Sequence, residues 1–396
     1  MRRTILVFIA ALAASASVGL AFQGAAGGPY RVLQRAKVGG EGGWDYIYAD
    51  SVGRRLYIPR GATQARAATD TMPAVPAFEK RVAVFNLDTL EPIGEIAGVG
   101  GNGAAVCPKT GHGVTSDHPQ PSLFDVKTMK LIKNIDVPQG FQPDGIYCDT
   151  FNDHVYVFSH PTKSALAIDA ATGNALGSID LGGTPEQGVA DGKGTLYVVM
   201  QAESNIAVVD VKSMKTTAHY DFAEKGGRCN GLALDAKNGV LFVACGANAM
   251  TPAQGAPAQP TMVVMSAKDG KILTTLPLPG SSDGAQFNPA TMEAFATLGN
   301  GRLAVVKETS PTSFEMEQDL ETMNGARTIA LDTKTGHIFT MAQEFAPPPA
   351  QPPTPPAAPP AGAANPDRLG AGGRGGRGGG RGQAIPGSFT ILMIGK

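Results

Sequence analysis

The sequence predicts an all-β fold that is built from repeats, and three observations support this prediction. Short runs of β-branched and aromatic residues alternate with turn residues along nearly the whole chain. Between Gln142 and Gly183 four such runs follow one another, GIYC, HVYVFS, ALAID and ALGSIDL, with the turn AATGN between the last two. Units of this kind recur seven times, at a spacing of roughly 40 residues once insertions are set aside.

The units can be followed in order along the chain. The first has the runs DYIYAD, RRLYIP, RVAVFNL and EPIGEI, and the second has AAVC, HGVTS, SLFDV and KLIKNIDV. The third is the segment from Gln142 to Gly183, and the fourth runs from GVADGKGTLYVVM through NIAVVDVKSMKTTAHYDF. The fifth extends from Cys229 to Leu278, and the sixth has GAQFN, EAFATL, RLAVVKET and FEMEQDL. The seventh offers only three runs, ARTIALD, HIFTMA and SFTILMIG.

The missing strand of the seventh unit indicates how the repeats are closed. A meander of four strands cannot bury both faces alone, so neighbouring copies must supply the rest of its core. The run from Tyr30 to Val38 has no partner nearby and would complete the seventh unit as its outer strand. Pairing both ends of the chain in one sheet closes a ring and leaves no open edge. We therefore predict a seven-bladed β-propeller of four-stranded blades, a single domain over residues 28 to 396.

The turns between the third and fourth strands resemble a known repeat family. They read FNLDTLEP, FDVKTMKL, IDAATGNAL, VDVKSMKT and MSAKDGKIL, and LYVVMQAESNIAVVD precedes one of them. Together these segments resemble the YVTN-type β-propeller repeat, the family that includes YncE-like exported proteins. The resemblance implies a seven-bladed propeller that is often periplasmic. It implies no catalytic residues, because the matching positions build strands and turns.

The first 21 residues have the pattern of a signal peptide. Arg2 and Arg3 precede the apolar run from Ile5 to Ala14, and Gly19-Leu20-Ala21 provides a small-x-small cleavage site. The apolar run is short for a membrane span, although an uncleaved anchor is the alternative. We therefore expect a periplasmic or secreted monomer without a transmembrane segment after cleavage. The 33 basic and 34 acidic residues balance, so no overall field favours a polyanion or a membrane surface.

Three insertions interrupt the repeats, each between the second and third strands of a blade: Gly61 to Glu79, Ala249 to Pro260, and Ala346 to Gly387. In a propeller these loops lie on the same face as the loops that enter the first strands. That face is expected to be loop-rich and to carry binding.

The third insertion, residues 346 to 387, is expected to be a disordered loop of two parts. Its first part is rich in proline, and its second part is an Arg-Gly-rich stretch that cannot bury enough apolar surface to fold. The arginines of this stretch could contact nucleic-acid phosphates weakly: Arg368, Arg374, Arg377 and Arg381. A solvated low-complexity loop that binds nothing is the alternative interpretation.

The four cysteines fall into two pairs. Cys229 and Cys245 flank a predicted hairpin that would place them opposite each other, so a disulfide can form there if the compartment is oxidising. Cys107 and Cys148 occupy matching positions in the first strands of successive repeats. An apolar residue would serve equally well there, and we interpret them as buried thiols.

A ring of polar side chains is predicted where the first strands begin, around the mouth of the central channel. Its oxygen ligands are of the kind that Ca²⁺ accepts: Asp45, Asn102, Asp144, Asn230 and Asp283. Trp44, Gln187 and Arg327 lie at the same level and could bind a ligand. Asp-Gly and Asn-Gly are also turn formers, so the same residues can be explained without a metal. Likewise, Trp44 could fill a gap between blades instead of stacking on a ligand.

Two histidines form a third candidate group. His118 and His160 each follow the second strand of a blade, precede proline, and lie on the loop-rich face. With Asp117 or Asp144 they could hold a transition metal or serve as a catalytic acid and base. The alternative is that both are ordinary surface loop residues.

These patterns favour a binding or interaction scaffold that engages an unknown protein or small molecule through the loop-rich face and channel mouth. No Ser-His-Asp order, phosphate loop, zinc-ligand spacing or nucleotide fingerprint occurs in the right context, which argues against an enzyme. The enzymatic alternative is a metal-dependent, lactonase-like hydrolase with its site at the channel mouth. Weak nucleic-acid binding through the Arg-Gly-rich loop is the second alternative.

Overall fold

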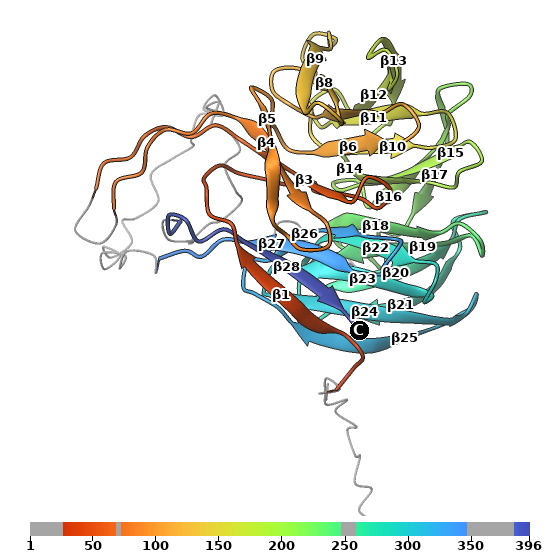
Figure 1. Cartoon of the computed structure of the whole chain (residues 1–396). Helices are drawn as coiled ribbons and strands as arrows, with labels where there is room; N and C mark the ends of the chain where they lie inside the picture. Colours follow the sequence, from red (N-terminus) through yellow and green to blue (C-terminus); the bar gives the residue numbers. More distant parts are fainter. Residues whose placement is uncertain (1–26, 69–72, 247–258, 347–383) are drawn as a thin grey trace, which may run out of the picture.

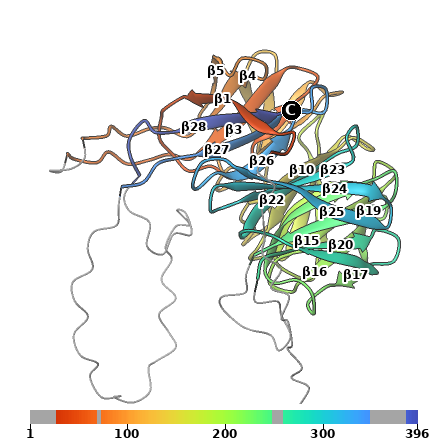
Figure 2. The ribbon, with the colours of Figure 1, turned by 90° about the horizontal axis from the view of Figure 1, so that it is seen from below.

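The computed structural model describes residues 27–68, 73–246, 259–346 and 384–396. These residues form 28 strands in seven four-stranded antiparallel sheets. No helix long and apolar enough to cross a membrane occurs in them. The sheets follow one another around a ring (Figures 1 and 2), since the first strands contact in the order β2, β6, β10, β14, β18, β22, β26 and back to β2. The prediction of a seven-bladed β-propeller is confirmed.

The strands of the first three blades have the following bounds. Blade 1 contains β2 (Tyr48–Asp50), β3 (Arg55–Arg60), β4 (Arg81–Asn86) and β5 (Pro92–Ala97). Blade 2 contains β6 (Ala104–Cys107), β7 (His112–Thr115), β8 (Ser122–Asp125) and β9 (Lys130–Asn134). Blade 3 contains β10 (Ile146–Asp149), β11 (His154–Ser159), β12 (Ser164–Asp169) and β13 (Ala175–Asp180).

The next three blades have the same order. Blade 4 contains β14 (Pro185–Ala190), β15 (Thr195–Met200), β16 (Asn205–Asp210) and β17 (Lys215–Asp221). Blade 5 contains β18 (Cys229–Asp235), β19 (Val240–Cys245), β20 (Thr261–Ser266) and β21 (Ile272–Pro277). Blade 6 contains β22 (Ser282–Asn288), β23 (Glu293–Leu298), β24 (Arg302–Ser310) and β25 (Ser313–Glu321).

Blade 7 joins the two ends of the chain. Its own strands are β26 (Arg327–Leu331), β27 (Ile338–Ala342) and β28 (Thr390–Gly395), and the N-terminal strand β1 (Arg31–Lys37) pairs antiparallel with β28 as the outer strand. This is the predicted closure. Tyr30, which precedes β1, is buried, packs edge-on against Phe295 of blade 6 and donates a hydrogen bond to the Glu293 carboxylate. Lys396 lies 2.9 Å from the same carboxylate, so both ends of the chain are fastened to blade 6.

Burial along the strands explains why the sequence forms blades. Middle strands such as β19 and β23 are buried at every position, because the faces of two neighbouring blades cover them. Outer strands such as β17 alternate between exposed and half-buried residues, since they have one blade neighbour and one solvent side. The core therefore lies between blades, and one cluster joins Tyr156 and Phe158 of blade 3 to Leu196 of blade 4.

The recurring turn between the third and fourth strands has the same geometry in several blades. The Asp125 carboxylate accepts hydrogen bonds from the backbone N–H and the hydroxyl of Thr128, and Asp169 does the same with Thr172. These bonds lower the pKa of both aspartates. Four residues after the position of the aspartate, the chain adopts a positive φ in five blades, at Leu90, Met129, Gly173, Met214 and Gly270. The recurring motif is thus a hydrogen-bonded turn that reverses the chain.

The three insertions lie between the second and third strands of their blades, as predicted. Most of the second and third, and the predicted disorder of residues 346 to 387, lie outside the described residues. The first insertion pairs with itself through bridges at Thr63–Phe78 and Arg66–Val75. Its two arms run side by side away from the blades (Figure 1).

Both cysteine pairs form disulfides. Cys229 and Cys245 lie opposite each other in the β18–β19 ladder and are bonded. Cys107 and Cys148 are also bonded, with their Cα atoms 5.8 Å apart, so the interpretation of this pair as buried thiols was wrong. Equivalent positions of β6 and β10 lie side by side around the channel, which brings the two side chains together. The sequence spacing alone does not show this contact between blades.

We expect the bond between blades to contribute more to stability than the bond within blade 5. The Cys107–Cys148 disulfide closes a 41-residue separation and the Cys229–Cys245 disulfide one of 16 residues. Loop-closure entropy predicts about 4 kcal/mol for the first and about 3 kcal/mol for the second. Denaturant unfolding of the Cys107→Ala/Cys148→Ala and Cys229→Ala/Cys245→Ala variants measures the difference. A larger loss in the second variant would contradict this expectation.

A buried carboxyl group between blades 5 and 6 makes stability depend on pH. Glu308 of β24 is 3% exposed and accepts a hydrogen bond from Asn238 at 2.8 Å. Burial and the nearby Asp235 raise its pKa from 4.5 to about 7. The folded protein therefore takes up a proton that the unfolded chain lacks between pH 4.5 and 7. The stability of the wild type should fall as pH rises through this window and level off above pH 7.

The Glu308→Gln variant tests this expectation, because its amide oxygen can still accept from Asn238 while the charge is gone. A pKa change of this size corresponds to at most about 3 kcal/mol. We expect the variant to gain stability over the wild type in urea unfolding at pH 8, and to lose most of that gain below pH 5. An equal gain in stability at pH 8 and below pH 5 would contradict the raised pKa of Glu308.

Candidate metal centre at the channel mouth

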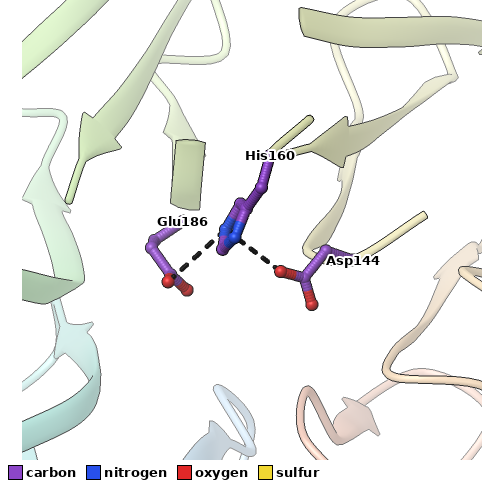
Figure 3. A group of neighbouring side chains, drawn as sticks. All are labelled: Asp144, His160 and Glu186. Carbon is purple, nitrogen blue, oxygen red and sulfur yellow. Dashed lines mark ion pairs between the residues drawn. The ribbon is translucent and has the colours of Figure 1, made fainter. Parts of the chain in front are cut away.

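Three side chains from blades 3 and 4 converge at one end of the central channel. Asp144 lies at the entry to β10, His160 follows β11 directly, and Glu186 is the second residue of β14. Backbone hydrogen bonds from Asp144 N to Phe158 O and from Phe158 N to Gly145 O extend the β10–β11 ladder to this level. The ladder therefore holds Asp144 beside His160, and the neighbouring blade brings Glu186 to the same point (Figure 3).

The His160 imidazole lies between the two carboxylates. Its Nε2 atom is 3.0 Å from Asp144 Oδ2 and 3.4 Å from Glu186 Oε1. The three ligand atoms all lie within 4.8 Å of one another. The three side chains are between 7% and 14% exposed, so the group is largely shielded from bulk solvent while still reachable.

A second layer of side chains orients the carboxylates. Asn102 donates to Asp144 Oδ1 at 2.7 Å, so the other oxygen of Asp144 is the one that faces His160. Tyr46 donates to Glu186 Oε2 at 2.9 Å, and Gln201 donates to Glu186 Oε1. Outer partners of this kind fix the direction of metal ligands. Each carboxylate thus directs one oxygen toward the imidazole.

Several carboxylates lie close together at the channel mouth, with Arg327 beside them. Burial and the carboxylates of Asp283, Asp144 and Glu186 raise the pKa of Asp45 well above its ordinary value, while Arg327 opposes them. Burial and Glu186 likewise raise the pKa of Tyr46. Asp45, Asp144, Glu186 and Asp283 therefore interact with one another and with Arg327 in one small region.

The remaining predicted ring residues lie around this group in other roles. Asn230 accepts a hydrogen bond from Gln201 at 2.7 Å and donates to Asp283 at 3.3 Å. The Arg327 guanidinium lies 4.0 Å from Asp283 and 5.2 Å from the Trp44 ring. Trp44 is buried and packs edge-on against Phe389 in the core of blades 1 and 7.

Gln187 is engaged with backbone groups across the channel. Its side-chain oxygen accepts from the N–H groups of Leu232 and Ala285, both at 3.0 Å, and its amide donates to Ala285 O at 2.8 Å. It therefore ties β14 to β18 and β22. These bonds give Gln187 a structural role at the position where the sequence suggested a ligand contact.

The two candidate histidines lie apart. His160 belongs to the candidate metal group of Asp144, His160 and Glu186, whereas His118 is exposed and lies outside it. Near His118, Lys80 pairs with the buried Asp117 at 2.7 Å. The predicted nucleic-acid contacts, Arg368, Arg374, Arg377 and Arg381, lie outside the described residues.

Sequence reasoning missed Glu186, Gln201 and Tyr46. Glu186 stands beside Gln187 in the segment PEQG, and an irregularity in the ladder between Pro185 and Gly188 changes the alternation of side chains there. Tyr46 follows Asp45 directly, yet its hydroxyl reaches Glu186 on a blade far along the chain. The sequence did offer one signal for Glu186, since it is an acidic residue at the start of the first strand of its blade.

Comparison with known proteins supports the fold and no closer relationship. Neither protein family profiles nor curated protein sequences match the chain. A solved structure described as the crystal structure of a mitotic checkpoint complex is similar, with a TM-score of 0.61 and 11% identity, over 86% of this chain and 96% of that one. Kuenenia stuttgartiensis hydrazine synthase is similar with a TM-score of 0.58 and 15% identity, over 74% of this chain and 91% of that one.

Proposed function

We propose that this chain is an exported β-propeller binding protein that holds one divalent transition-metal ion between Asp144, His160 and Glu186. The distances within this group carry the proposal. A metal about 2.1 Å from each ligand places neighbouring ligand atoms about 3.0 Å apart at a right angle and about 3.4 Å apart in a tetrahedron. The two distances from His160 Nε2, 3.0 and 3.4 Å, lie within the range that these two angles span.

The ligand set indicates which metals fit. Calcium binds oxygen ligands, six to eight of them, whereas one imidazole nitrogen with two carboxylate oxygens suits Zn²⁺, Mn²⁺ or Fe²⁺. We therefore replace the calcium ring that the sequence suggested by a smaller site in which Asn102 and Tyr46 act as supporting residues.

Three features support export and binding on the loop-bearing face. The first 21 residues have a signal-peptide pattern, and the turn motifs resemble the YVTN-type family of exported propellers. Two disulfides fit an oxidising compartment. The metal group lies at the end of β11, on the face that also carries the first insertion. A partner or small molecule bound there would reach the metal directly.

A metal-dependent hydrolase is the second candidate, and the number of ligands favours it. Three protein ligands leave a position for water or a substrate oxygen, as in catalytic zinc sites. In that case His160 holds the metal and does not transfer the proton. A screen of lactones and esters with the metal-loaded protein tests this activity.

Calorimetric titration of the chelator-treated mature protein tests the metal site. We expect one Zn²⁺ per chain with micromolar or tighter affinity, Mn²⁺ more weakly, and Ca²⁺ much more weakly than either. Absence of Zn²⁺ binding, or a preference for Ca²⁺, would contradict the proposal.

A further inference from the structure

A buried arginine near the root of the first insertion has no ion-pair partner among the described residues. Arg60, the last residue of β3, is 2% exposed. Its Nε donates to Gly42 O at 3.1 Å, and its guanidinium carbon lies 3.4 Å from the centroid of the Phe389 ring. Its Nη2 atom is buried and has no hydrogen-bond partner among the described residues. Guanidinium remains charged in proteins, and a buried charge without a partner is costly.

A second guanidinium group, that of Arg81, lies beside it and donates to the backbone oxygens of Glu79 at 3.1 Å and Glu41 at 3.3 Å. A Cβ atom on Gly40 would lie 2.9 Å from Arg81 Nη2 and 3.9 and 4.0 Å from the two terminal nitrogens of Arg60, so both side chains approach Gly40. Burial and the charge of Arg81 lower the pKa of Arg60 to about 9, although Glu41 opposes this shift, and Arg60 is still protonated at neutral pH. Like charges this close favour an anion between them.

The carboxylates nearby are already engaged. Glu41 is buried and pairs with Arg66 at 3.3 Å. Glu95 lies 3.6 Å from Arg81 Nε, on the exposed side of β5. The described residues therefore provide no carboxylate within ion-pair distance of Arg60.

The glycine-rich segment 39–43 provides further donors. The backbone N–H groups of residues 40 to 43 have no backbone acceptor among the described residues. Gly39, Gly40 and Gly42 have φ values of +64°, +76° and +105°, which favour glycine. With no side chain at Gly40, a ligand atom can approach the main chain beside both guanidinium groups.

We propose that Arg60, Arg81 and the Gly39–Gly43 segment bind an oxyanion, a carboxylate or a phosphate group of a small ligand. The planar guanidinium forks suit both groups, because each can accept two parallel N–H bonds. The site lies on the loop-bearing face and is independent of the metal group, because it shares no residue with it.

Calorimetric titration of the chelator-treated full chain with inorganic phosphate and with acetate tests the proposal. At low ionic strength we expect one saturable site, unchanged in a His160→Ala variant, and a preference that identifies the stronger anion class. Arg60→Met keeps the stem over Phe389 but removes the charge, and Arg81→Gln removes the second fork. Each should weaken binding at least tenfold, roughly the effect of one charge-assisted bond. Arg31→Gln, on the exposed strand β1, is the matched control.

Three results would overturn the proposal. The first is that the wild type binds neither anion, and the second is that a folded Arg81→Gln variant binds as the wild type does. The third is that Arg31→Gln loses as much anion affinity as the other variants, which would mean that the protein binds an adventitious ion only. If Arg60→Met does not fold, Arg81→Gln decides the matter. Failure here leaves the zinc titration unaffected, so the two proposals can fail separately.

Discussion

The His160→Ala variant is expected to lose zinc binding by more than about 100-fold in affinity. His160 supplies the only nitrogen of the three-ligand group, and its ring lies between Asp144 and Glu186. Without His160 only the two carboxylates remain, and their oxygen atoms alone bind a transition metal far less tightly. Calorimetry of chelator-treated wild type and variant at the same pH measures the change.

A matched control separates this site from adventitious histidine binding. His118 is also followed by proline and lies on the same face, but it is outside the group of Asp144, His160 and Glu186. His118→Ala removes it. Its zinc affinity should equal that of the wild type. Asn102→Ala removes the bond to Asp144 Oδ1 and should weaken binding about tenfold, as expected for an outer partner. Equal losses in His118→Ala and His160→Ala would contradict the assignment.

Removal of the N-terminal strand is expected to destabilise the whole propeller. A chain that begins at Val38 lacks Tyr30 and β1, so β28, whose six residues are all buried, becomes an unpaired edge strand. Loss of one large buried side chain such as Tyr30 alone costs about 3 to 5 kcal/mol. An open edge also invites pairing between molecules. We therefore expect a free energy of unfolding lower by more than about 4 kcal/mol, together with aggregation.

Thermal unfolding and light scattering of this truncation measure both effects. A chain that begins at Gly28 retains Tyr30 and β1 and should behave as the wild type does. The Tyr30→Phe variant isolates the hydrogen bond to Glu293 and should lie between the two. Equal stability of the two truncated chains would mean that β1 is not needed for closure.

The fold could be predicted because its determinants are local and repeat. The aspartate turns at Asp125 and Asp169 are readable from a few residues, and each fixes where one strand ends and the next begins. The missing strand of the last unit predicted the pairing of β1 with β28. Both inferences need only the count and order of strands.

The candidate site was predictable only in part, because it depends on contacts between blades. Asp144, His160 and Asn102 were recognised as residues of the right kind on the right face. Glu186 was missed in favour of Gln187, because the irregular start of β14 decides which of two adjacent side chains faces the metal group. The Cys107–Cys148 disulfide was missed for a related reason, since the sequences of β6 and β10 do not show how close the two strands lie.

The metal content of the protein, purified without added metal and dialysed extensively, tests the central claim most directly. Elemental analysis should find about one transition-metal ion per chain in the wild type and in His118→Ala, and none in an Asp144→Ala/His160→Ala variant that remains folded. No metal in the wild type after reloading with Zn²⁺, or the same content in the double variant, would contradict the account.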